Sequence, residues 1–344
     1  MGQNLVILFG SDSSERFVSV ATAQNLSEAL LNARCWFWAP NDSVYEVSSS
    51  DLQAAKNVFK AEFKPAGTPI ATHLSEALDL AKANGYEFVL ATHGGKSEDG
   101  TLQALFEKRG LVFTGSGSKA CHLSMDKAGA KKAVAARQIR VAPSTAVTGK
   151  DFQNANAAIH QMLHAHSRLV LKPNWEGSSV GVSIVTQDNV NEALASLKSH
   201  ADRPYLVEAF VEGIELTVGV IDEGGVPRAL VPTELRAKNG LADYDGKYLG
   251  LGTDEITPAE VPEAIALEAQ RMAVAAHDAL GLEGYSRTDM IASHEGVVYL
   301  ETNSLPGLTK ASLVPQALAY EGISIHQFIM QQLELARARL NRQL

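Results

Sequence analysis

The first third of the chain alternates between short apolar runs and longer segments with helical spacing. Strands are predicted at residues 5–9, 35–39 and 87–92, and helices at 15–32 and 74–83. Apolar strands that alternate with helices pair in parallel, and the helices cover both faces of the sheet. The pattern therefore predicts an α/β fold that begins with a doubly wound parallel sheet, whose ligands bind beyond the carboxyl ends of its strands.

Two polar loops, residues 10–16 and 93–100, follow such strand ends. Glu15 in the first loop opens a helix, where the helix dipole favours a carboxylate even without a ligand. His93 and Glu98 lie in the second loop, and loops at this edge of a parallel sheet often carry function. Glu15 and His93 are therefore candidates for an active site, with helix capping as the alternative.

A second unit is predicted to begin near residue 119. Strands are expected at 168–172 and 180–185, on either side of a Gly/Ser turn. Successive N–H groups and serine hydroxyls in such a turn can hold phosphate oxygens, and Lys172 adds a positive charge at the strand end. A plain β-hairpin is the alternative, and Lys127 by itself would more often be a solvated lysine.

A third unit is predicted from strands at 205–211, 215–221 and 229–235. A polar, glycine-rich stretch follows at 237–253, and its length is typical of a functional or mobile loop. An amphipathic helix is expected at 262–280. The resulting domain boundaries are 1–118, 119–206 and 207–344.

Two acidic residues enclose an extended segment that could hold a purine base. Glu208 lies in a predicted strand and Glu215 in the next. Backbone groups of such a segment can meet the edge of adenine, with Phe210 or Val211 against its face, and Glu215 could accept from ribose hydroxyls. An ordinary hairpin with exposed acids is the alternative.

Oxygen ligands gather on two apolar strands that are joined by a turn at Gly296. Side chains two residues apart on a strand share a face, so Arg287 lies with Asp289, and Glu301 lies with Asn303. Two carboxylates and an amide are typical of a Mg²⁺ site that shares its coordination with water and substrate phosphates. A structural salt-bridge network is the alternative.

The composition excludes several classes of partner. The 344 residues are 45% hydrophobic and 20% charged, with a net charge of −9, which argues against a general binder of nucleic acid or acidic membranes. Two cysteines, Cys35 and Cys121, give no disulfide framework. We find no signal peptide and no apolar run of membrane-spanning length, so the sequence predicts a cytoplasmic protein.

Taken in order, these segments resemble the D-alanine–D-alanine ligase family of ATP-grasp enzymes over nearly the whole chain. The resemblance is carried by SSER at 13–16, HGGKSEDGTLQ at 93–103, TGSG at 114–117, MDK at 125–127, KPNWEGSSVGV at 172–182, DYDGKY at 243–248, RTD at 287–289 and ETNSLPGLTKASL at 301–313. It implies a three-domain fold in which two α+β domains clamp ATP. It also implies a homodimer that makes D-alanyl-D-alanine for peptidoglycan through an acyl phosphate.

For the nucleotide, the resemblance implies phosphate contacts from lysines, adenine and ribose contacts from the segment after the central strands, and two Mg²⁺ ions that Mn²⁺ can replace. The residues are Lys127, Lys172 and Lys247 for the phosphates, Glu208, Phe210 and Val211 for the adenine, Glu215 for the ribose, and Asp289, Glu301 and Asn303 for the metal.

For the two D-alanines, the resemblance implies an ammonium contact, a hydrogen-bonded set that links the mobile loop to the substrate, an oxyanion site and a carboxylate site. Glu15, with His93 nearby, would contact the ammonium, and Ser178 and Tyr248 would form the hydrogen-bonded set with Glu15. Arg287 and the Gly307 N–H would form the oxyanion site, and Ser312 and Leu313 the carboxylate site.

The chain departs from the family pattern around the first amino-acid pocket. The first loop reads FGSDSSER at 9–16, where a glycine pair before the Ser and Glu is usual, so Ser11 and Asp12 alter the pocket wall. Lys96 and Ser97 stand where small, glycine-rich residues are usual. These departures motivate an alternative, a related ATP-grasp ligase that joins other amino acids. Tyr248 resembles the dipeptide-forming members, which favours an amine acceptor.

Overall fold

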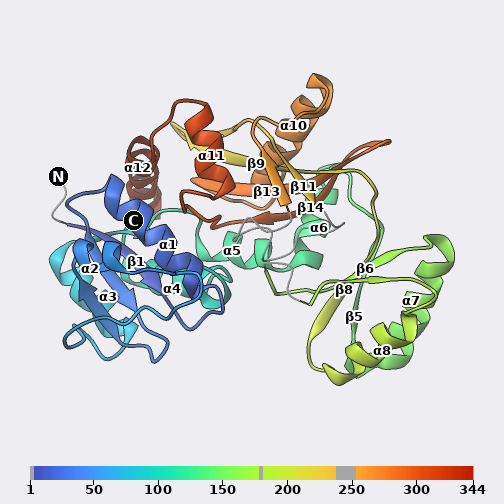
Figure 1. Cartoon of the computed structure of the whole chain (residues 1–344), viewed down its shortest axis with the longest axis horizontal. Coiled ribbons are helices and arrows are strands. Elements are labelled where there is room, and N and C mark those ends of the chain that lie inside the picture. Colours follow the sequence, from blue (N-terminus) through green and yellow to red (C-terminus); the bar gives the residue numbers. More distant parts are fainter. Residues whose placement is uncertain (1–3, 178–180, 238–252, 344) are drawn as a thin grey trace.

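The computed structural model describes residues 4–177, 181–237 and 253–343. Three sheets make up the molecule (Figure 1). The first sheet lies at one end of the long axis, the central sheet at the other end, and the C-terminal sheet between them. None of the helices in these ranges has the length and apolar character needed to cross a membrane.

The first sheet has the order β3-β2-β1-β4. Its strands β1 (Leu5–Gly10), β2 (Arg34–Trp38) and β4 (Glu87–Leu90) are parallel, as predicted, and β3 (Val44–Val47) adds an antiparallel edge. Every residue of β1 is buried, because helices cover both faces of this sheet. The helices of this part are α1 (Arg16–Ala29), α2 (Ser49–Ala54), α3 (Leu74–Asn84) and α4 (Thr101–Arg109).

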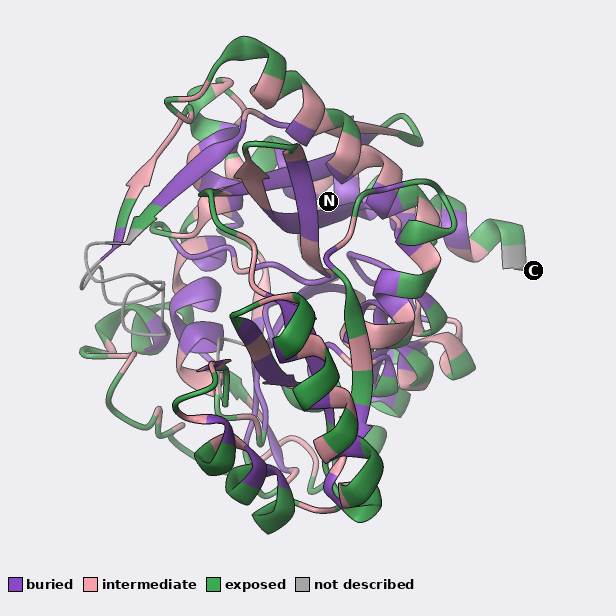
Figure 2. Cartoon of the chain, turned by 90° about the vertical axis from the view of Figure 1, so that its right-hand side faces the viewer, coloured by how far each residue is buried: buried purple, intermediate pink, exposed green. Residues whose placement is uncertain are grey.

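The central sheet is antiparallel, with the order β5-β8-β6-β7. Its strands are β5 (Ser144–Thr148), β6 (Leu169–Pro173), β7 (Ser183–Val185) and β8 (Pro204–Ala209), and α7 (Phe152–Ala165) and α8 (Val190–Ser199) cover one face. This sheet and its two helices enclose a hydrophobic core of their own. The outward sides of the helices are exposed, whereas the inner strands β6 and β8 are largely buried (Figure 2).

Two expectations about this region are wrong. The strand expected at 205–211 was assigned to the third unit, but β8 pairs with β5 and β6 and therefore belongs to the central sheet. The boundary after residue 206 consequently falls inside a strand. Pairing on both edges fixes β8 in place, and such long-range pairing is not visible in the strand's own sequence.

The C-terminal sheet has the order β12-β11-β9-β13-β14, and β10 pairs with β9. Its strands are β9 (Ile214–Glu223), β10 (Val226–Ala229), β11 (Thr233–Ala237), β12 (Thr253–Ile256), β13 (Tyr285–Ser293) and β14 (Gly296–Asn303). The helices α10 (Glu263–Ala279), α11 (Leu313–Tyr320) and α12 (Ile325–Gln343) accompany it. The helices α5 (Ser118–Met125) and α6 (Lys127–Ala135) also pack here, against β14.

The single strand expected at 229–235 is instead two strands. Ala229 pairs with Val220 and Thr233 pairs with Thr217, so the chain between them holds one residue more than the facing part of β9. Pro232 lies in this interval and has no N–H to donate to a ladder. The extra residue and the proline together explain the break.

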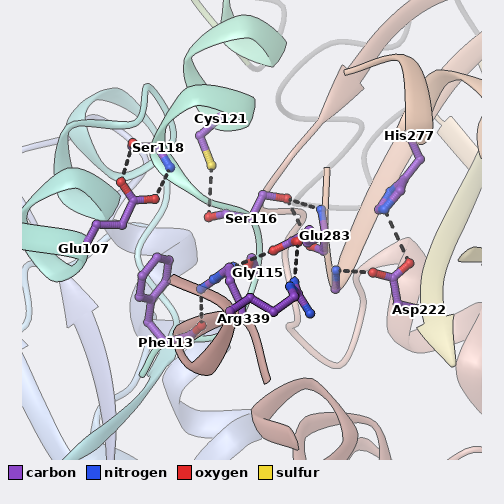
Figure 3. Close-up of polar contacts among 12 residues, drawn as sticks. Glu107, Phe113, Gly115, Ser116, Ser118, Cys121, Asp222, His277, Glu283 and Arg339 are labelled. Atoms are coloured by element: carbon purple, nitrogen blue, oxygen red, sulfur yellow. Dashed lines mark hydrogen bonds and ion pairs between the residues drawn. The ribbon is translucent and has the colours of Figure 1, made fainter. Parts of the chain in front are cut away.

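The C-terminal helix connects the first sheet to the C-terminal sheet (Figure 3). Arg339 of α12 donates to the carbonyl oxygens of Phe113 (2.8 Å) and Gly115, and its guanidinium lies 4.2 Å from the Phe113 ring centroid. Ser116 exchanges two hydrogen bonds with the backbone of Glu283, each of 3.0 Å. The segment that enters α5 is therefore fixed from two sides.

An acidic residue of β9 stabilises the turn beside this junction. The Asp222 carboxylate accepts a 2.7 Å hydrogen bond from the Gly284 N–H and lies 3.5 Å from His277 Nε2. Burial acts to raise the pKa of Asp222, but hydrogen bonds from His277 and Gly284 outweigh it and hold this pKa below its usual value.

Candidate active site

One pocket is lined by residues from all three parts of the molecule. The first sheet's loops contribute Glu15 and Glu98, and α6 contributes Lys127. The loop after β6 contributes Gly177, and the β13–β14 hairpin contributes Arg287. The other residues that line it are Ser124, Met125, Glu301, Thr302, Asn303 and Ser304.

The β13–β14 hairpin presents four polar side chains on one face. Arg287 stands opposite Asn303, and Asp289 opposite Glu301. Arg287 binds Asp289 through two hydrogen bonds of 2.8 Å, from Nε to Oδ1 and from Nη2 to Oδ2. Thr217 on β9 donates a further hydrogen bond of 2.6 Å to Asp289 Oδ1. The shared face expected from the sequence is present.

The donor set on this face fits Mg²⁺. A carboxylate has about four acceptor positions, so Asp289 can bind a cation in addition to Arg287 and Thr217. Glu301 Oε2 lies 3.4 Å from Lys127 Nζ. Nowhere in residues 4–177, 181–237 or 253–343 do three His, Cys, Asp or Glu side chains gather as a metal site. An ion here would therefore depend on the Asn303 amide and on phosphate oxygens, as Mg²⁺ commonly does.

Lys131, Glu208 and Lys172 form a buried cluster that includes two of the nucleotide-binding residues expected from the sequence, Glu208 and Lys172. Glu208 Oε2 is 2.6 Å from Lys131 Nζ, and Glu208 Oε1 is 2.6 Å from Lys172 Nζ. All three side chains are buried. Lys131 was not expected from the sequence, although it follows Lys127 by one helical turn and so lies on the same side of α6.

The cluster shifts the pKa of each member. Burial alone would raise the pKa of Glu208, but the two lysines hold it below its usual value. Burial acts to lower the pKa of Lys172, yet the charges of Glu208, Glu301 and Asp289 raise it overall. For Lys131 burial prevails over the attraction of Glu208, and its pKa is lowered.

The start of α6 is bound to the loop after β6. Lys127 Nζ donates a 2.6 Å hydrogen bond to the carbonyl oxygen of Glu176. Asp126 caps the helix by accepting from the Gly129 N–H at 3.1 Å, and it accepts from Asn174 Nδ2 at 2.7 Å. Lys127 is thus held at the pocket by a local network.

Three loops converge on Glu15. Its N–H donates a 3.0 Å hydrogen bond to Ser13 Oγ. A Cβ added at Gly94 would lie 3.2 Å from Glu15 Oε1, and one added at Gly177 would lie 3.1 Å from the same atom. The Glu15 side chain makes no capping hydrogen bond to α1, so helix capping does not explain this carboxylate.

His93 is buried beneath the pocket. Its Nε2 lies 3.0 Å from Thr22 Oγ1, and its Nδ1 lies 3.5 Å from Glu98 Oε1. Glu98 also accepts a 3.0 Å hydrogen bond from the Gly94 N–H. His93 therefore supports the loop, and Glu98 is the member of this pair that lines the pocket.

Two groups of the other expected residues lie in the described parts of the chain. Gly307 lies beside Ser312, since a Cβ on Gly307 would be 2.9 Å from Ser312 Oγ, and Leu313 opens α11. Phe210 and Val211 follow β8, with the Arg168 guanidinium 4.3 Å from the Phe210 ring centroid, and Glu215 lies in β9. Ser178, Lys247 and Tyr248 lie outside the described residues.

Comparison with known proteins identifies the family. Residues 4–116 match the family model described as the D-ala D-ala ligase N-terminus, and residues 134–334 match the one described as the D-ala D-ala ligase C-terminus. The D-alanine--D-alanine ligase of Geotalea uraniireducens is 37% identical over 268 residues, covering 76% of this chain and 84% of that protein. The D-alanine--D-alanine ligase of Caulobacter vibrioides is 33% identical, covering 98% of this chain and 94% of the relative.

The fold agrees with this assignment. The crystal structure of D-alanine--D-alanine ligase from Bacillus anthracis complexed with ATP superposes with a TM-score of 0.74 at 23% identity, covering 99% of each chain. The expected three-domain ATP-grasp fold is thereby confirmed. The chain belongs to the D-alanine–D-alanine ligase family.

Proposed function

We propose that this protein joins two molecules of D-alanine into D-alanyl-D-alanine for peptidoglycan synthesis, converting ATP to ADP and phosphate. The observation that carries the proposal is the single pocket in which Glu15, Lys127 and the Arg287–Asn303 face meet. A carboxylate that accepts an ammonium and cations that accept phosphate then lie within one site, which is what an acyl-phosphate ligase needs.

The reaction proceeds in two balanced steps. A carboxylate oxygen of the first D-alanine attacks the γ-phosphorus of ATP, the bond to the bridging oxygen breaks, and ADP leaves. The free amine of the second D-alanine then attacks the acyl carbon and forms a tetrahedral oxyanion. The carbon–oxygen bond to phosphate breaks, the nitrogen loses a proton, and the dipeptide and phosphate are released.

Lys127 and Lys172 contact the phosphates of ATP in this proposal. Asp289, Glu301 and Asn303 would hold two Mg²⁺ ions, replaceable by Mn²⁺, which would supply positive charge to neutralise the phosphates. Glu208, Phe210 and Val211 meet the adenine, and Glu215 meets the ribose. Because both oxygens of Glu208 already face lysines, Glu208 also serves as the counterion that holds Lys172 in place.

The amino-acid substrates are held by groups around the same pocket. Glu15 binds the ammonium group of the first D-alanine, and His93 supports it. Arg287 and the Gly307 N–H stabilise the oxyanion, and Ser312 with Leu313 binds the second carboxylate. The Arg287–Asp289 pair, with two hydrogen bonds of 2.8 Å, fixes the guanidinium before substrate arrives.

Further proposals come from the family resemblance alone. Lys247 reaches the γ-phosphate from segment 237–253, and Ser178 and Tyr248 link that segment to Glu15. The protein acts in the cytoplasm as a homodimer. The domain boundaries, in contrast, follow the sheets: we place the first near residue 118, as expected, and move the second from 206 to 209, the end of β8.

The test is incubation of the purified protein with MgATP and D-alanine, followed by phosphate release and mass spectrometry of the product. We expect phosphate and D-alanyl-D-alanine in equal amounts. L-alanine, D-serine and D-lactate serve as comparison substrates. ADP formation without a dipeptide, or a faster reaction with another pair of substrates, would refute the D-alanine assignment.

A further inference from the structure

The loop that carries Glu15 contains a strained residue. Ser11 directly follows β1 and has a φ of 109°, a backbone conformation that glycine adopts readily and other residues rarely do. Its side chain is only 1% exposed. A non-glycine residue keeps such a conformation only where its surroundings fix it, and such residues concentrate at functional sites.

The surroundings of Ser11 fix it at both its backbone and its side chain. The Ser11 N–H donates a 2.7 Å hydrogen bond to the carbonyl oxygen of Trp38, at the end of the neighbouring strand. Ser11 Oγ accepts a 3.2 Å hydrogen bond from the Ser13 N–H. Glycine would keep the first bond and lose the second, so the hydroxyl is what serine adds at this position.

A chain of hydrogen bonds then leads from Ser11 to Glu15. Ser13, held by Ser11 Oγ, uses its own Oγ to accept the 3.0 Å hydrogen bond from the Glu15 N–H. Ser13 Oγ also lies against Gly94, where any added Cβ would collide with it. The position of the Glu15 backbone is therefore set by Ser13, and the position of Ser13 is set by Ser11.

An ion pair gives the loop a second attachment. Asp12 Oδ2 lies 2.8 Å from Lys96 Nζ, which is in the loop after β4. Both side chains are partly exposed, so this pair contributes little energy by itself. It nevertheless connects the two loops that converge on Glu15.

We propose that Ser11 is a positioning residue for the first amino acid: its hydroxyl, acting through Ser13, holds Glu15 where it binds the substrate ammonium. The inference rests on the proposed function of Glu15. Ser11 does not line the pocket and therefore acts through Ser13 and Glu15, at the expense of a strained backbone.

The proposal predicts opposite effects on stability and binding in one variant. Ser11→Gly relieves the strained φ and should leave Tm unchanged or raise it. The same variant loses the hydroxyl, and the Michaelis constant for the first D-alanine should rise about three- to tenfold, as expected for one hydrogen bond. The Michaelis constants for the second D-alanine and for ATP should stay unchanged.

Two further variants separate the causes. Ser11→Ala keeps the strain and loses the hydroxyl, so its first-site Michaelis constant should rise as in Ser11→Gly, with no gain in Tm. Gln138→Gly is the matched control, because Gln138 has a φ of 62° but is exposed and lies outside the pocket. It should gain or retain stability without any change in kinetics.

The measurements are thermal unfolding and initial rates over a D-alanine series at saturating MgATP, fitted with two amino-acid binding steps. An unchanged first-site Michaelis constant in Ser11→Gly, or a fall in its Tm, would overturn the proposal. A wild-type protein that makes no dipeptide would instead overturn the proposed function, so the two failures are distinct.

Discussion

Replacing Glu208 by glutamine removes the shared counterion of two buried lysines. Each ammonium group lies 2.6 Å from one oxygen of Glu208. Lys172 keeps the nearby charges of Glu301 and Asp289, which also raise its pKa. The stability lost in Glu208→Gln therefore arises mainly at Lys131, because burial already lowers the pKa of this lysine.

The size of the loss has an upper limit, because Lys131 can release its proton. Deprotonating a lysine with an unfolded-state pKa of about 10.4 at pH 7 costs about 4.6 kcal/mol. This limit agrees with the roughly 3–5 kcal/mol typical of breaking a buried ion pair. We expect Glu208→Gln to lower the free energy of unfolding by up to this amount at pH 7.

The loss of unfolding free energy in Glu208→Gln should become smaller as the pH rises. A lysine with a lowered folded-state pKa destabilises the protein most at low pH, and the penalty disappears as the pH approaches the unfolded-state value. Between pH 7 and 9, Glu208→Gln should therefore regain stability relative to wild type, by at most about 2.7 kcal/mol for one titrating group. Lys131→Met/Glu208→Gln has no buried ammonium at this position, so it should lack this recovery.

Urea denaturation of the three ligand-free proteins at pH 7, 8 and 9, followed by circular dichroism, measures these differences. Equal stability of Glu208→Gln and wild type at pH 7 would refute the counterion role. A double variant that gains stability with pH as steeply as Glu208→Gln would show that Lys131 is not the titrating group.

Three other substitutions test the site and its support. Arg287→Ala should lower kcat by about 10²- to 10³-fold, as for the loss of an oxyanion donor. Arg34→Ala, at a partly buried arginine outside the pocket, should keep the wild-type rate in the same phosphate-release assay. Gly94→Ala should raise the Michaelis constant for the first D-alanine, because its Cβ would displace Ser13 Oγ and its φ of 70° disfavours alanine. Asp222→Asn should make the fall of Tm between pH 5 and 3 less steep than in wild type. A carboxyl group with a lowered pKa stabilises the folded protein above its unfolded-state pKa, and this stabilisation is lost as the pH falls through its folded-state pKa.

Local patterns predicted the parts of the molecule that depend on local rules. The alternation of strands and helices predicted the parallel first sheet, because each element's periodicity is visible in its own sequence. The two-residue period of the β13–β14 hairpin predicted that Arg287 and Asp289 share a face, and they do.

Features that depend on distant partners could not be predicted in this way. The place of β8 in the central sheet depends on its pairing with β5 and β6. Lys131 resembles any helical lysine until the fold brings Glu208 to it across a gap of 77 positions along the chain. The spacing from Lys127 was the one local signal, and helical spacing alone does not show which side of a helix is buried.

The two large hydrophobic cores have a consequence for how the chain opens. One core is continuous from the strands of the first sheet to Leu305, Phe328 and Leu333 near the C-terminus, whereas the core of the central sheet, around Ile159 and Leu197, is separate. Segments that share a core exchange their amide hydrogens in one cooperative opening. The strand β1 and the helix α12, distant in sequence, therefore belong to one such unit and have their amides protected together, while the central sheet forms another unit that can open by itself.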